Sequence, residues 1–248
     1  MAKQVIVIRH GDDPPDDRVY TWLVTNGFEP VIEKPFAGDL LGEPGDDLAG
    51  TVIHGGVYNV YETAKYPFLN EEYRWIGACL ERRVPMLGIC QGAQQIAHHL
   101  GAKVGPAESG LFEFGYYEIA PTIAGQVVFP GPLTVCQAHY HTFAIPEGGV
   151  CLAGNAAFPN QAFKYGDNVY GFLFHPEVTI VSFRRWQSAP WAHYGKPGAQ
   201  SREEQNRLMM QHDGAVAEWF YGFMDRLFRA SDTTDHAGQE PGLCVFRL

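Results

Sequence analysis

Short apolar runs alternate with more polar, longer segments through the N-terminal part of the chain. The runs are rich in Val, Ile and Leu, which is typical of strands that are buried on both faces. The clearest intervening segment, residues 91–100, places apolar residues at positions i, i+3, i+4 and i+7 and is followed by a glycine, as expected of a helix that ends there. Strands are predicted at residues 4–9, 30–33, 50–54 and 86–88. Helices are predicted at residues 17–26, 71–83 and 91–100.

This order of elements predicts an α/β fold with a mostly parallel, doubly wound sheet and helices on both faces. Between about residues 113 and 174 the pattern changes to short strands broken by Gly and Pro, which indicates antiparallel additions to the sheet. Residues 202–228 are expected to form a long amphipathic helix. Its predicted apolar side consists of Leu208, Val216, Phe220, Phe223 and Leu227.

We divide the chain into a catalytic domain at residues 1–190, a helical extension packed on it at 191–230, and a tail at 231–248. A chain of 248 residues with 46% hydrophobic residues can bury a full core, so one domain with an appendage is expected.

Composition narrows the class of protein. The formal net charge of −10 argues against nucleic-acid binding, which requires a basic face. The five cysteines are an odd number and form no C-x-x-C pair, which favours a reducing compartment and argues against structural zinc. No apolar run approaches the length of a membrane span, and the N-terminus has no leader pattern, so we expect a cytoplasmic protein without membrane contact.

Candidate chemistry lies where the strand at 86–88 meets the next helix. Cys90 is flanked by Gly88 and Gly92 in a Gly-x-Cys-x-Gly turn, which allows a nucleophile on a tight bend with close neighbours. The N-terminus of the helix favours the thiolate over the thiol. His175 and Glu177 follow 85 residues later at the end of another apolar run. In an extended chain they point to the same side, so the carboxylate can orient the imidazole as a base for the sulfur.

Each of these features alone has a plainer explanation. A single cysteine after an apolar strand is usually a buried small hydrophobe. A single His-Pro-Glu at the end of a strand is more often structural. Their joint presence favours a Cys-His-Glu triad that attacks a carbonyl group, forms a thioester and releases an amine or ammonia.

These residues resemble the class I (triad-type) glutamine amidotransferases, and within them stand-alone proteins similar to the glutaminase domain of GMP synthase. The resemblance covers roughly residues 4–180 and also includes the segments at 52–56, 113–116 and 139–143. It implies Cys90 as nucleophile, His175 as general base and acid, and Glu177 as its orienting carboxylate.

The resemblance further implies an oxyanion hole formed by the backbone N–H groups of Gly56 and Gln91. It implies substrate contacts from Gly55, Gln94, His139 and Tyr140. Two departures from the family pattern, Val57 after the Gly-Gly pair and His54 before it, predict an altered oxyanion loop. His141 stands where many relatives have Asp.

A second resemblance is rejected. Arg9-His10-Gly11 after an apolar strand is similar to the signature of histidine phosphatases. The acidic residues that follow would repel a phosphate, and the next histidine, His54, is too near in sequence for the intervening domain of such enzymes. We expect a turn at the rim of the active site, followed by a solvated loop at residues 12–17.

Other polar and aromatic clusters receive structural interpretations. The histidine pairs at 98–99 and at 139 and 141 are assigned to a helix end and a polar strand end, and no metal or cofactor is expected. The aromatic residues Trp186, Trp191 and Tyr194 are expected to pack or to form an interface.

Three functions remain open. The first is glutamine hydrolysis through a Cys90 thioester, with ammonia delivered to an acceptor on a synthetase partner chain, because no synthetase-like segment is found in the sequence. The second is a γ-glutamyl peptidase or hydrolase that uses the same triad. The third is a catalytically silent regulatory or binding subunit. Self-association into a homo-oligomer also stays open.

Overall fold

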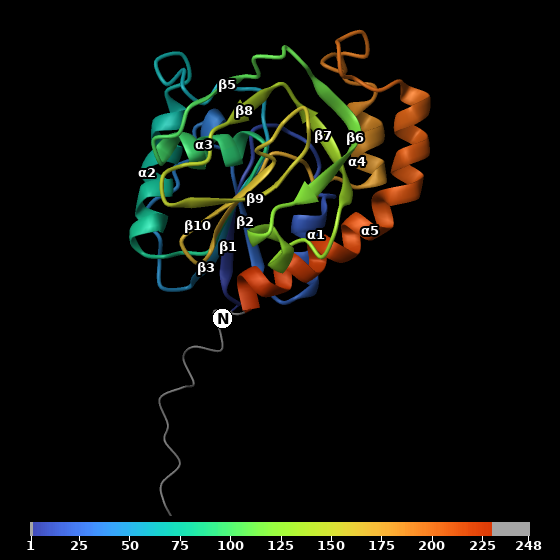
Figure 1. Ribbon diagram of the computed structural model, residues 1–248. Coiled ribbons are helices and arrows are strands. Elements are labelled where there is room, and N and C mark those ends of the chain that lie inside the picture. Colours follow the sequence, from blue (N-terminus) through green and yellow to red (C-terminus); the bar gives the residue numbers. More distant parts are fainter. Residues whose placement is uncertain (1, 230–248) are drawn as a thin grey trace, which may run out of the picture.

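The computed structural model describes residues 2–229 and is built around one large mixed sheet (Figure 1). Its nine strands are ordered β2-β1-β3-β4-β11-β10-β9-β6-β7. The parallel block consists of β2 (Glu29–Glu33), β1 (Gln4–Ile8), β3 (Leu48–Ile53), β4 (Met86–Ile89) and β11 (Val169–Phe172). The antiparallel part consists of β10 (Ala162–Tyr165), β9 (Gly149–Gly154), β6 (Glu113–Pro121) and β7 (Leu133–His139).

Helices cover both faces of the sheet. On one face, α1 (Arg18–Thr25) and α5 (Arg202–Arg229) share a core with the strands through Trp22, Phe172 and Phe220. On the other face, α2 (Phe68–Glu81) and α3 (Gln91–His99) pack through Trp75 and Ile96 (Figure 1). The predicted fold class is confirmed, because the parallel strands are wound with helices on both sides and the antiparallel strands extend one edge.

Shorter elements complete the fold. Strands β5 (Val104–Pro106) and β8 (His141–Phe143) form a separate antiparallel pair. Two 3₁₀ helices lie at Pro35–Ala37 and Ala124–Val127. Helix α4 (Ile180–Trp186), which the hydrophobic pattern did not reveal, begins with a capping box in which Thr179 and Ser182 bond to each other's backbone N–H groups.

The long helix near the C-terminus forms as predicted, and α5 ends at Arg229. Its buried side includes Met209, whereas the predicted neighbour Leu208 is only partly buried. Buried Gln205 on α5 donates a hydrogen bond to the carbonyl of Phe114 at 3.0 Å, so the helix is joined to β6 by polar as well as apolar contacts. The proposed tail at 231–248 lies outside the described residues. None of the helices between residues 2 and 229 is long and apolar enough to cross a membrane.

Candidate active site

Cys90 occupies a strained turn between β4 and α3. Its φ of 50° lies in the left-handed region, which residues other than glycine rarely adopt. The turn is tight because a Cβ on Gly92 would lie 2.0 Å from the carbonyl oxygen of Ile53, and one on Gly88 would lie 2.5 Å from the backbone of Gly92. The two glycines thus let β4 turn sharply into α3, and Cys90 lies at the carboxyl end of β4, where it lines a cavity.

His175 and Glu177 follow β11, the parallel neighbour of β4. Phe172 pairs with Ile89, so both segments leave the sheet at the same edge. The His175 Nδ1–H donates to Glu177 Oε1 at 2.8 Å, which leaves Nε2 available to the sulfur of Cys90. The ring is also held by Trp186, whose ring centroid lies 4.8 Å away in an edge-to-face arrangement.

The histidine lies in an electrostatic environment that favours its charged form. Burial alone would lower the pKa of His175, but the negative charge of Glu177 and the hydrogen bond and charge of Cys90 raise it to about 10. An imidazolium beside a thiolate is the form in which a cysteine attacks a carbonyl and a histidine protonates the leaving nitrogen.

The Gly55-Gly56 loop follows β3, on the other side of β4. A Cβ on Gly55 would lie 2.8 Å from His175 Cε1 and 3.3 Å from Cys90 Cβ, so the loop backbone touches both side chains. Within residues 2–229, the backbone N–H groups of Gly56 and Gln91 donate no hydrogen bond to protein. The Gln91 side chain accepts a hydrogen bond from the Tyr58 N–H at 2.9 Å and ties the loop to α3.

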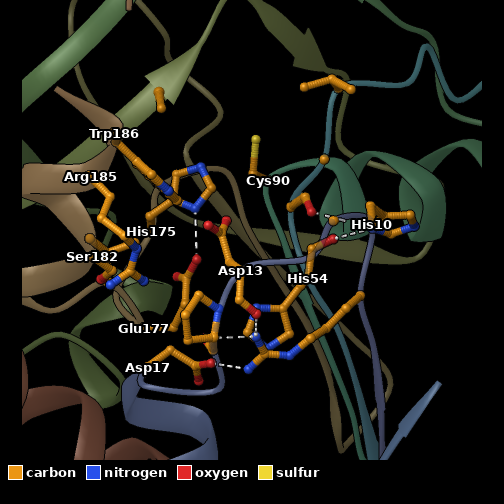
Figure 2. A pocket seen from close by; sticks show the side chains of 18 of the residues that line it. His10, Asp13, Asp17, His54, Cys90, His175, Glu177, Ser182, Arg185 and Trp186 are labelled. Atoms are coloured by element: carbon orange, nitrogen blue, oxygen red, sulfur yellow. Dashed lines mark hydrogen bonds and ion pairs between the residues drawn. The ribbon is translucent and has the colours of Figure 1, made fainter. Parts of the chain in front are cut away.

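A cavity of about 260 Å³ connects these groups (Figure 2). Its lining includes Cys90, His175 and Glu177 together with Gly55 and Gly56. Most of the remaining wall comes from the segment that follows β1 and from α4 with its neighbour Trp191, and Ala138 on β7 also lines it.

The segment after β1 corrects an expectation from the sequence. Residues 12–17 were expected to form a solvated loop, but Asp16 and Asp17 are held in ion pairs at the cavity wall. Asp16 accepts two hydrogen bonds from Arg185 at 2.6 and 2.7 Å. Asp17 pairs with Arg9 and caps α1 by accepting from the Tyr20 N–H at 2.9 Å. Only the first part of the loop is solvated.

Three of the predicted substrate contacts are not among the described residues that line this cavity. Both ring nitrogens of His139 are engaged, with Glu113 Oε2 at 3.0 Å and the carbonyl of His141 at 3.1 Å. The Gln94 amide donates to the same carbonyl at a long 3.5 Å. The Tyr140 ring packs edge-to-face on the His141 ring, and Tyr140 is about half exposed.

Some residues of the site were not predicted from the sequence. Arg9 and His10 were assigned to the rim, and both turn out to be buried. Both residues follow the carboxyl end of β1, as Cys90 follows that of β4. Because the carboxyl ends of parallel strands meet at one edge of a sheet, their place in the site could have been predicted from the sequence. Trp186 and Trp191 pack against each other as expected, but they also line the cavity. For the region that the structure describes, we find no cluster of three side chains suited to a metal ion.

The fold and the site together define a class: a doubly wound α/β protein with a cysteine, a histidine and a glutamate at the carboxyl ends of adjacent strands. The family model for glutamine amidotransferase class-I matches residues 40–185, so the chain belongs to that family and the resemblance seen in the sequence is confirmed.

Relatives and solved structures agree with this assignment. The chain is 30% identical over 167 residues to the glutamine amidotransferase-like protein YfeJ of Salmonella typhimurium, covering 64% of this chain and 69% of the relative. It is 33% identical over 141 residues to a GMP synthase of Porphyromonas gingivalis, covering 54% of this chain but only 26% of the relative. The chain therefore spans about a quarter of the GMP synthases that it matches.

Among solved structures, a glutamine amidotransferase from Thermotoga maritima superposes with a TM-score of 0.82 at 26% identity, covering 92% of this chain and 99% of that one. One from Methylobacillus flagellatus gives a TM-score of 0.84 with full coverage of both chains. At 21% identity the latter supports the fold alone.

Proposed function

We propose that the chain hydrolyses the side-chain amide of glutamine through a thioester on Cys90. The thiolate attacks the amide carbon, and a C–S bond forms as the carbonyl electrons move onto oxygen. The N–H groups of Gly56 and Gln91 stabilise this oxyanion. When the tetrahedral intermediate collapses, the C–N bond breaks and His175 transfers its proton to the leaving nitrogen, which departs as ammonia. His175 then takes a proton from water, whose oxygen attacks the thioester to yield glutamate and the free thiolate.

The observation that carries this proposal is the meeting of three strand ends. Cys90, the His175–Glu177 pair and the Gly55-Gly56 loop follow β4, β11 and β3, which are neighbours in the sheet. A nucleophile, an oriented base and unbonded N–H donors are the parts that acyl transfer requires.

Glutamate release from glutamine by the purified chain tests the proposal. We expect Cys90→Ser to abolish turnover and Cys151→Ser to leave it unchanged, because Cys151 lies on β9, is only partly buried, and does not line the cavity. A glutamine-like diazoketone should label Cys90, and the fraction of chains labelled should equal the fraction of activity lost. Turnover by the Cys90→Ser variant would contradict the mechanism. A wild-type chain that is neither active nor labelled would instead indicate a silent subunit.

A second candidate, hydrolysis of larger γ-glutamyl amides, is favoured by the shape of the cavity. His175 protonates the leaving nitrogen, so substituents on that nitrogen would lie beyond His175, where Trp186 and Trp191 continue the wall. Free space lined by two indole rings suits an amine larger than ammonia. Turnover of glutamine and of γ-glutamyl amides by wild type and Trp191→Ala separates the two functions. If Trp191→Ala loses turnover of γ-glutamyl amides but keeps turnover of glutamine, the result favours γ-glutamyl hydrolysis.

If the chain hydrolyses glutamine, we propose that the ammonia is delivered to a synthetase partner. The chain is similar to part of a glutamine-hydrolysing GMP synthase, and a PurLQS structure from Thermotoga maritima shares its fold. A partner that raises glutamine turnover by this chain would support such an arrangement.

A further inference from the structure

His10 is a buried side chain that contacts the loop at residues 54–56 from the segment after β1. It follows β1, which pairs with β3, and its side chain is fully buried. Its Nδ1 lies 3.1 Å from the carbonyl oxygen of His54 and 3.3 Å from that of Gly55. Its Nε2 lies 3.2 and 3.1 Å from the two carboxylate oxygens of Glu72 on α2.

The partners fix which ring nitrogen carries a proton. Carbonyl oxygens only accept hydrogen bonds, so Nδ1 must be the donor toward the loop. At Nε2 one proton is shared between the imidazole and the Glu72 carboxylate. Glu72 is fully buried and also accepts from the Gln95 side chain on α3. Helices α2 and α3 therefore hold the imidazole so that Nδ1 points at the loop.

A hydrogen bond to the Gly55 carbonyl sets the direction of the next N–H. In a trans peptide the C=O and N–H point in opposite directions, so the carbonyl that faces His10 turns the Gly56 N–H away from it. The peptide lies between two glycines, which populate both signs of φ, and it could otherwise rotate. A rotated peptide would present a carbonyl oxygen, instead of an N–H donor, to the developing negative charge.

Packing restricts the same peptide. A Cβ on Gly56 would lie 2.6 Å from His10 Cβ and 2.5 Å from Gln91 Oε1. The glycine is thus enclosed between the histidine below and the first residue of α3.

We propose that His10 is a positioning residue that holds the Gly55–Gly56 peptide with its N–H available to the oxyanion. The inference rests on the proposed function, because it assigns His10 a role in that reaction. His10 does not touch the reacting atoms. It acts through the backbone of the loop.

Two substitutions separate the bonds that His10 makes. In His10→Asn the amide nitrogen is attached to Cγ, as Nδ1 is in histidine, so the donor toward the Gly55 carbonyl is kept and the bond to Glu72 is lost. In His10→Gln the longer side chain keeps a donor toward Glu72 and loses the one toward the loop. Both variants are compared with wild type for kcat and KM with glutamine, for thermal unfolding, and for the rate of Cys90 alkylation by iodoacetamide.

We expect His10→Gln to lower kcat by about 100-fold, within the ~10²–10³ range for loss of one oxyanion donor, with KM changed less than about threefold. His10→Asn should recover at least about tenfold of that loss. Alkylation by iodoacetamide is a displacement at carbon that forms no oxyanion, so its rate should match wild type in both variants. A structural role alone would reduce alkylation and kcat together.

Three results would overturn the inference: wild-type kcat in folded His10→Gln, equal losses in the two variants, or a parallel fall in alkylation. If either single variant fails to fold, Glu72→Gln provides a second test, because its side-chain amide N–H can donate to Nε2 while Nδ1 keeps its proton toward the loop, and kcat should stay within about threefold of wild type. A larger loss at Glu72 would contradict the arrangement described. Absence of glutamine turnover in wild type, by contrast, refutes the proposed function itself, and this inference with it.

Discussion

Substituting Gly55 by alanine would place one methyl group against the side chains of His175 and Cys90. The added Cβ would lie 2.8 Å from His175 Cε1 and 3.3 Å from Cys90 Cβ. The first distance is shorter than real contacts allow, so the imidazole must shift by several tenths of an ångström or the loop must move. Overpacking of this kind costs about 1–3 kcal/mol. At about 2–4 °C per kcal/mol, the melting temperature should fall by a few degrees to about ten.

The effect on catalysis should exceed the effect on stability. A displacement of about 1 Å at a reacting group can cost ~10²-fold in rate, so we expect kcat to fall between about tenfold and 100-fold while most of the chain stays folded at 25 °C. Gly105→Ala is the matched control, because nothing lies within 4 Å of its Cβ and its site on β5 is outside the cavity. Steady-state glutaminase kinetics and thermal unfolding are measured on both. Wild-type kcat in Gly55→Ala would refute the contact between the loop and the triad.

Four further expectations follow from the charges and bonds of the site. The pKa of His175, which burial would lower and which Glu177 and Cys90 raise to about 10, should fall in Cys90→Ala when followed by NMR titration. This pKa in the folded state exceeds the unfolded value of about 6.5. Protonation of His175 therefore stabilises the fold fully below pH ~6.5, and this stabilisation is lost as the pH rises through 10. The difference in stability between wild type and Glu177→Gln should shrink across that interval. Arg18→Met should lower the free energy of unfolding, measured in urea, by about 3 kcal/mol. The substitution removes the hydrogen-bond donor of the Pro176 and Val178 carbonyls, which flank Glu177, and of the Asp213 carboxylate. His139→Ala should lower thermal stability while KM for glutamine changes less than about twofold, because the ring is bonded within the protein; a large change in KM would instead support the predicted substrate contact.

The parts of the site that were predictable from the sequence are those encoded locally. The Gly-x-Cys-x-Gly turn, the His-Pro-Glu segment and the Gly-Gly loop each follow a run of apolar residues, and parallel strands bring such ends to one edge. The strand order could not be predicted in the same way, since nothing near residue 172 shows that β11 inserts beside β4.

The parts that escaped prediction depend on distant partners. Asp16 is unremarkable until Arg185, 169 residues away, folds against it. His10 and Glu72 are 62 residues apart. Helix α4 is short and rich in β-branched and aromatic residues, so its propensity is weak and its capping box becomes evident only with the backbone in place.

The insertion of β11 has a consequence for the order in which the proposed site is assembled during folding. Strand β11 lies between β4 and β10, so its contact with β4 closes a loop of some 80 residues and belongs to the slow, non-local part of assembly. Until that strand is seated, Cys90 has neither His175 nor Glu177 beside it. Under the proposed mechanism the site around Cys90 is therefore complete only when the sheet is complete, and the rate of Cys90 modification during refolding should report the arrival of this one strand.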